Sequence, residues 1–115
     1  MLPPTDTLEI TCAELAALRE PGAGIPIRLV DCRELDEWDI CHIEGAELCP
    51  LSTFAEQGPK RYADETLPII IYCHHGVRSG NAAHFLRKRG TKNVWSLAGG
   101  IEQWACEIEP GMARY

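Results

Sequence analysis

Hydrophobic positions along this chain follow two periodicities in alternation. Short apolar or β-branched runs, typical of strands, alternate with stretches in which apolar residues recur every three or four positions, as in amphipathic helices. The strongest strand pattern is residues 68–73, Pro-Ile-Ile-Ile-Tyr-Cys, whose continuous apolar run suits a central strand buried on both faces. The strongest helix pattern is residues 79–89, followed by Gly90 at the position of a C-terminal cap.

Weaker forms of the same patterns predict the other elements. Further strands are expected at residues 7–11, 27–32, 46–49 and 93–97, and helices at 11–19, 34–40 and from 101 until Pro110-Gly111. Thr11 and Glu14 fit a capping box at the start of the first helix. Residues 52–66 are expected to form a loop with one helical turn. This alternation predicts an α/β fold with a central, mostly parallel five-stranded sheet and helices on both faces.

The length of 115 residues suits one compact domain, so residues 1–115 are expected to be a single unit with a core at about 5–108 and short flexible termini. No apolar run approaches the roughly 18 residues that span a bilayer. The start, Met-Leu-Pro-Pro-Thr-Asp, lacks the basic and apolar segments of a signal peptide. These patterns predict a cytoplasmic protein with no membrane partner.

A formal net charge of −6 opposes nonspecific attraction to nucleic acid or anionic membranes. We therefore expect no nucleic-acid partner, and any anionic substrate has to be attracted by local groups.

The six cysteines fall below the density of small disulfide-stapled secreted domains, which favours reduced thiols. Cys32, Cys41, His42 and Cys49 lack the paired spacing of common zinc modules. We therefore expect no metal site.

The segment that carries the chemistry joins the strongest strand to the strongest helix. Cys73 ends the strand, so it is expected at the carboxyl edge of the sheet, where open α/β folds bind ligands. A short loop entering a helix points several backbone N–H groups inward, and the helix start adds partial positive charge. A thiolate at position 73 is stabilised there, and the thiolate is the reactive form of cysteine.

The residues after Cys73 are the predicted substrate-binding set. Arg78 offers a fork of donors suited to an oxyanion, and Gly76 permits the backbone geometry of a tight loop. The two histidines add positive charge, donate hydrogen bonds or line the mouth of the pocket, depending on their protonation. The whole set is His74, His75, Gly76, Val77, Arg78 and Ser79. The competing interpretation is that Cys73 is only a small buried hydrophobic residue at a strand end.

Three separated stretches of the chain resemble the rhodanese-like family. Residues 31–46, with Asp-Cys-Arg-Glu-Leu-Asp-Glu-Trp followed by His-Ile-Glu-Gly-Ala, are similar to the Asp-x-Arg and Gly-His-Ile-x-Gly-Ala signatures of the family. Residues 73–79 resemble its catalytic loop, and residues 97–104 resemble its C-terminal Gly-Gly and Trp element. Cys41 departs from the pattern, since the family usually has glycine before His42.

This resemblance implies a thiosulfate sulfurtransferase-like enzyme that needs no cofactor. Cys73 would take sulfane sulfur from a donor such as thiosulfate as a persulfide and pass it to cyanide or a thiol. Two alternatives stay open. The first is a sulfur carrier or binding module that exchanges sulfur with a protein donor or acceptor and turns over little alone. The second is a phosphatase or arsenate reductase, although those relatives have a longer loop than the four residues between Cys73 and Arg78.

The other signature residues are assigned to the scaffold. Asp31, Arg33, Glu37 and His42 are expected to be structural, with Arg33 paired to a carboxylate. Four further cysteines, Cys12, Cys32, Cys49 and Cys106, lack the anion-cradle context and are expected to be inert, while Cys41 is a candidate second redox thiol.

Overall fold

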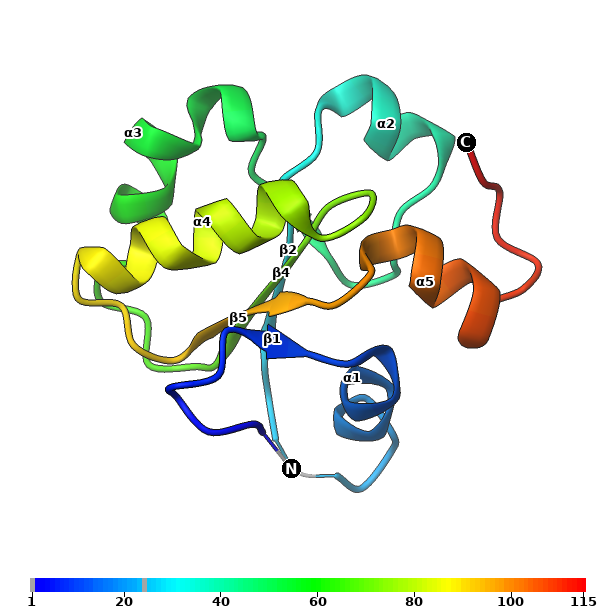
Figure 1. The fold of residues 1–115 in the computed structure, drawn as a ribbon, viewed down its shortest axis with the longest axis horizontal. Helices are drawn as coiled ribbons and strands as arrows, with labels where there is room; N and C mark the ends of the chain where they lie inside the picture. The colour runs from blue at the N-terminus through cyan, green and yellow to red at the C-terminus, as the bar shows by residue number, and fades with distance from the viewer. Residues whose placement is uncertain (1, 24) are drawn as a thin grey trace.

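The computed structural model describes residues 2–23 and 25–115 and contains one five-stranded sheet (Figure 1). The strands are β1 (Glu9–Ile10), β2 (Arg28–Asp31), β3 (Glu47–Leu48), β4 (Ile69–Tyr72) and β5 (Val94–Leu97). All of them are parallel, in the order β1-β5-β4-β2-β3. The predicted α/β fold is confirmed, with β4 at the centre of the sheet.

Helices cover both faces of this sheet. They are α1 (Cys12–Leu18), α2 (Leu35–Ile40), α3 (Leu51–Tyr62), α4 (Val77–Lys88) and α5 (Gly100–Glu107). Helices α3 and α4 lie on one face, and α1 and α5 lie on the other (Figure 1). No helix in the described ranges is long and apolar enough to cross a membrane.

Side chains of β4 point alternately into two hydrophobic clusters. Ile70 and Tyr72 pack with α1 and α5, whereas Ile69 and Ile71 pack with α3 and α4. All four strand residues are buried, as the continuous apolar run predicts for a strand covered on both faces. Cys73 continues the alternation and falls on the α3 and α4 side.

The capping box predicted at the start of α1 is confirmed. The Thr11 hydroxyl accepts a hydrogen bond from the Glu14 amide at 3.1 Å, and the Glu14 carboxylate accepts one from the Thr11 amide at 2.9 Å. This capping box satisfies two amides that have no partner inside the helix.

The prediction of a loop at residues 52–66 is wrong, because α3 is a 12-residue helix there. Gly58 and Pro59 suggest a break in the sequence, yet Phe54, Gly58 and Tyr62 stand four residues apart and form one buried stripe. Gly58 packs directly under Phe54, where a Cβ would come within 2.7 Å of the ring. Burial of this stripe outweighs the weak helix propensity of the two residues.

The start of α4 also differs from the prediction. The helix begins at Val77, two residues before Ser79, and Gly76 is its N-cap. Gly76 has a φ of +105°, a conformation that favours glycine. The early start brings a helical amide, that of Ser79, within hydrogen-bonding distance of the Cys73 sulfur.

Candidate active site

The sulfur of Cys73 accepts hydrogen bonds from two backbone amides. The Gly76 amide is 3.0 Å from Sγ, and the Ser79 amide is 3.3 Å from it. Cys73 is only 1% exposed, so the sulfur lies at the bottom of the loop. The amides turn inward, as an anion cradle at a helix start requires.

A pair of buried serines supports the cradle from below. The Ser79 hydroxyl lies 3.3 Å from the Cys73 sulfur and 2.7 Å from the Ser96 hydroxyl. Both serines are fully buried. Ser96 belongs to β5, so this contact fixes the start of α4 against the neighbouring strand.

Helix α5 holds the other side of the loop that follows Cys73. The Ile101 amide donates to the Cys73 carbonyl at 2.8 Å, and the Glu102 amide donates to the His74 carbonyl at 3.1 Å. Two amides that would lack partners at the first turn of a helix thereby bind the loop backbone. The Gly-Gly element of the sequence thus positions the Cys73 loop.

Cys32 lies beside Cys73 and is a site residue that the sequence interpretation missed. Asp31 and Tyr72 are register partners on β2 and β4, and Cys32 and Cys73 directly follow them. Both cysteines are buried in the cluster under α3 and α4. The neighbouring Cys32 thiol, together with hydrogen bonds from Ser79 and Gly76, lowers the pKa of Cys73 to about 5 despite burial. The anionic neighbour and burial raise the pKa of Cys32, so Cys32 stays a thiol.

Arg78 forms a bidentate ion pair with Glu37. The distances from Nη1 to Oε1 and from Nη2 to Oε2 are 2.7 and 2.8 Å. Among the hydrogen bonds of the described residues, Arg78 makes none to the Cys73 sulfur. The Arg78 guanidinium lowers the pKa of Glu37 to about 2. Glu37, assigned to the scaffold from the sequence, therefore belongs to the surroundings of the Cys73 loop.

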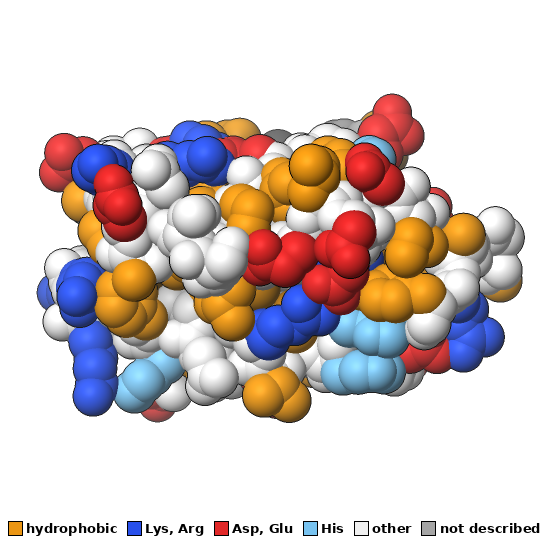
Figure 2. Space-filling view, turned by 90° about the horizontal axis from the view of Figure 1, so that it is seen from above, with side chains coloured by type: hydrophobic (Ala, Val, Ile, Leu, Met, Phe, Trp, Pro, Cys, Tyr) orange, Lys and Arg blue, Asp and Glu red, His pale blue; other side chains and the backbone are white. Residues whose placement is uncertain are grey.

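The two histidines line the loop as stacked rings. Their ring centroids are 3.9 Å apart, and the ring of His74 also stacks on Tyr115. Burial and the neighbouring His75 lower the pKa of His74, which favours its neutral form. Val77, the first residue of α4, is 73% exposed. Figure 2 shows acidic side chains lying beside basic ones and histidines on this side of the molecule.

The remaining signature residues have structural contacts. Arg33 and Asp31 form a fully buried ion pair, as the sequence predicts for Arg33. His42 stacks on Trp38 and lies 3.1 Å from the carbonyl of Trp38. Cys41 is partly buried and free. Among the described residues, no group of three or more His, Cys, Asp and Glu side chains is arranged to hold a metal ion.

Comparison with known proteins identifies the family. A family model described as the rhodanese-like domain matches residues 11–107. The chain belongs to the rhodanese-like domain family. Within this rhodanese-like chain, the three resembling stretches noted in the sequence converge on one site, since residues 31–46 carry Glu37, residues 73–79 form the loop and residues 97–104 hold it.

Two curated relatives and one solved structure illustrate the similarity. The thiosulfate sulfurtransferase GlpE of Haemophilus influenzae is 37% identical over 101 residues, covering 88% of this chain and 90% of the relative. The probable adenylyltransferase/sulfurtransferase MoeZ of Mycobacterium tuberculosis is 36% identical over 93 residues, but the match covers 81% of this chain and only 24% of that longer relative. The crystal structure of a rhodanese-related protein from Thermoplasma volcanium has a TM-score of 0.75 and 26% identity, covering 90% of this chain and 95% of the other.

Proposed function

We propose that this chain is a sulfurtransferase that carries sulfane sulfur on Cys73. The observation that supports this most directly is the Cys73 sulfur itself, which two inward amides hold at the start of α4. The lowered pKa of Cys73, about 5, means that the nucleophile is a thiolate at neutral pH. The similarity to a relative named thiosulfate sulfurtransferase agrees with this chemistry.

In the first step, the Cys73 thiolate attacks the outer sulfur of thiosulfate. A bond forms between the two sulfurs, the original S–S bond of thiosulfate breaks, and sulfite leaves with its electron pair. The Gly76 and Ser79 amides then stabilise the anionic persulfide on Cys73. In the second step, cyanide or a thiolate attacks the outer sulfur, which leaves Cys73 as a thiolate again. Both steps balance without a metal or an organic cofactor.

Arg78 is proposed to bind the sulfonate group of the donor. A guanidinium has five N–H donors, and the Glu37 carboxylate accepts from Nη1 and Nη2 of Arg78. The remaining donors are available to an oxyanion. His74, His75, Gly76, Val77 and Ser79 complete the proposed binding loop.

The test is a donor and acceptor panel on the wild-type chain and on Cys73→Ser. Thiocyanate formation from thiosulfate and cyanide is expected in the wild type and should vanish in Cys73→Ser, with Cys49→Ser as a control that retains activity. Intact mass after incubation with thiosulfate should rise by about 32 Da, the mass of one sulfur, only when Cys73 is present. Turnover that persists in Cys73→Ser would overturn the proposal.

A second candidate function is a sulfur carrier that exchanges sulfur with a protein. One observation favours this carrier function: the chain is similar to a segment that makes up only 24% of a longer protein named as a probable adenylyltransferase/sulfurtransferase. A persulfide on Cys73 together with negligible thiocyanate formation would identify this carrier function. A phosphatase or arsenate reductase remains a third proposal, and Cys73-dependent hydrolysis of an aryl phosphate would support it.

A further inference from the structure

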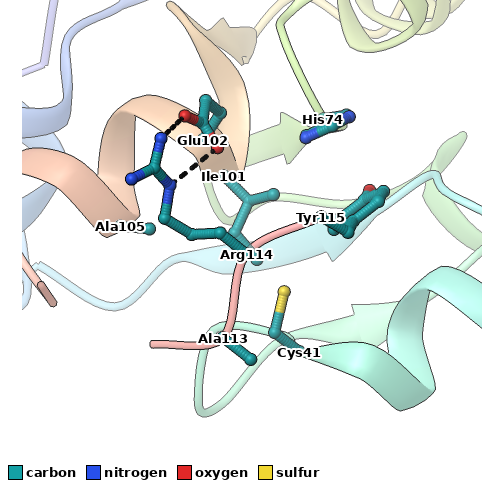
Figure 3. A pocket seen from close by; sticks show the side chains of 8 residues that line it. All are labelled: Cys41, His74, Ile101, Glu102, Ala105, Ala113, Arg114 and Tyr115. Carbon is teal, nitrogen blue, oxygen red and sulfur yellow. Dashed lines mark hydrogen bonds and ion pairs between the residues drawn. The ribbon is translucent and has the colours of Figure 1, made fainter. Parts of the chain in front are cut away.

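The last residues of the chain fold back from α5 toward the catalytic loop (Figure 3). The amides of Ile108 and Glu109 both donate to the Trp104 carbonyl, at 2.8 and 3.0 Å, which ends the helix. Arg114 then forms an ion pair with Glu102. The rhodanese-like match ends at residue 107, so this returning segment lies outside the region that the family model covers.

Tyr115 reaches three residues of the site through this return. Its ring stacks on His74, with centroids 3.9 Å apart and an interplanar angle of 12°. Its hydroxyl oxygen accepts a hydrogen bond from Arg33 Nη1 at 3.0 Å. The same hydroxyl donates to Glu37 Oε2 at 2.6 Å.

These contacts connect two ion pairs. Arg33 is paired with Asp31 in a fully buried position, whereas Glu37 is paired with Arg78 near the surface, with side-chain exposures of 16% and 33%. The Tyr115 hydroxyl lies between Arg33 and Glu37 and binds both. A continuous path of hydrogen bonds thus leads from the rigid end of β2 to Arg78.

We propose that Tyr115 is a positioning residue of the sulfur-transfer site, which fixes Glu37 and through it orients Arg78 toward an anionic sulfur donor. This inference rests on the proposed function, because it assigns Arg78 to donor binding. It also gives the Asp31-x-Arg33 signature a part in the site, as the rigid support behind Tyr115.

The physical basis is preorganisation. An arginine side chain at the surface has many rotamers, and ordering it on binding costs free energy. Glu37 can restrict the rotamers of Arg78 only if its own side chain is fixed. The Glu37 carboxylate accepts hydrogen bonds from the Glu34 amide, from the Tyr115 hydroxyl and from Arg78. Arg33 Nη1 also donates to the backbone carbonyl of Glu37 at 3.3 Å, so removing the tyrosine hydroxyl takes away the link from Arg33 to the Glu37 carboxylate, the group that binds Arg78.

Tyr115→Phe tests the inference, because it keeps the ring that stacks on His74 and removes only the hydroxyl. We expect kcat/KM for thiosulfate to fall by about three- to tenfold, the range for loss of one hydrogen bond. This fall should come from a higher KM for thiosulfate. By contrast, kcat/KM for cyanide should change by less than about twofold, because cyanide has no sulfonate for Arg78 to bind. Equal effects on both substrates, or no effect on thiosulfate, would overturn the inference.

Tyr62→Phe is the matched control. The Tyr62 hydroxyl donates to Glu47 at 2.8 Å, and Glu47 forms a bidentate pair with Arg28 at 2.7 and 2.9 Å. This Tyr-Glu-Arg arrangement has the same chemistry, but Arg28 stands at the opposite end of β2 from the Cys73 loop. Kinetics with thiosulfate should be unchanged in Tyr62→Phe.

A second measurement does not depend on turnover. The Nη signals of Arg78 in a ¹⁵N NMR spectrum, assigned by their loss in Arg78→Lys, sharpen only when the ion pair hinders rotation of the guanidinium. They should be sharp in the wild type and broadened in Tyr115→Phe. Unchanged signals would refute the positioning role. Failure of the wild type to form a Cys73 persulfide would refute the proposed function, and broadened Nη signals in Tyr115→Phe would then still show that Tyr115 orders Arg78.

Discussion

A Cβ atom on Gly100 would stand 2.4 Å from the carbonyl oxygen of His74 and 2.5 Å from that of Cys73. Gly100 also has a φ of +61°, where other residues are strained. The first turn of α5 therefore reaches the backbone of the Cys73 loop only because this position has no side chain.

Gly100→Ala is expected to separate α5 from the loop and to reduce the free energy of unfolding by about 2–4 kcal/mol. Urea unfolding measures this change. Gly80→Ala is the control, because Gly80 lies within α4 and a Cβ there meets nothing within 4 Å. That variant should be as stable as the wild type or more so by up to about 1 kcal/mol. Similar losses in both variants would contradict the steric argument.

The lowered pKa of Cys73 predicts a specific pH profile for sulfur loading. The rate should be nearly constant above pH 6 and fall on the acid side with an apparent pKa of about 5. The lowered pKa of Cys73 also contributes to the free energy of unfolding. This contribution is complete above the ordinary thiol pKa and is lost as the pH falls toward 5. Rates of persulfide formation from pH 4 to 8 check the profile, and a midpoint near 8 would contradict it.

Cys32→Ala should move that midpoint to higher pH, because the neighbouring thiol that lowers the pKa of Cys73 is lost. We expect an increase of about one unit, comparable to one hydrogen bond to a charged group. Cys49→Ala removes a buried cysteine from the same hydrophobic cluster and serves as the control. An equal shift in both variants would indicate a general packing effect.

Ser79→Ala should slow sulfur loading while leaving the Ser79 amide in place. The Cys73 sulfur loses the hydroxyl at 3.3 Å, and the buried Ser96 hydroxyl loses its neighbour at 2.7 Å. Because the pKa of Cys73 rises without this hydrogen bond, loading at pH 5 should fall by about three- to tenfold. Single-turnover release of sulfite measures the rate, and Ser52→Ala, at an exposed serine bound to Glu34, should leave it unchanged.

Arg33→Leu should be strongly destabilising, because it leaves the fully buried Asp31 carboxylate without its ion pair. Loss of one partner of a buried pair costs about 3–5 kcal/mol. By contrast, Lys60→Gln breaks an exposed pair with Glu56 on α3 and should change stability by less than about 1 kcal/mol. Thermal and urea unfolding of both variants tests the difference. A small loss in Arg33→Leu would mean that Asp31 finds another partner.

Much of the fold could be predicted from the sequence because each strand carries its own local pattern. The apolar run of β4 and the Thr11 to Glu14 capping box are readable without knowledge of distant residues. Helix α3 was missed because Gly58 and Pro59 oppose a helix locally, and only tertiary packing of Phe54 and Tyr62 supports it.

The candidate site was predicted less completely, because its contacts join residues far apart in the chain. The Cys73 loop is a continuous segment and was therefore visible. The Arg78 to Glu37 pair spans 41 positions, and the proximity of Cys32 to Cys73 follows from the register of β2 and β4. Strand order and register are not encoded in any single segment.

The uneven exposure of the cysteines determines how this chain will respond to thiol-labelling reagents. Cys106 on α5 is exposed, whereas Cys73, whose pKa is lowered to about 5, is almost fully buried. Bulky maleimides will therefore modify Cys106 first, and only small alkylating agents will reach the active thiolate. A fluorescent tag on the wild-type chain would report on α5, and replacing Cys106 and the partly exposed Cys41 beforehand would make a small reagent selective for the Cys73 loop.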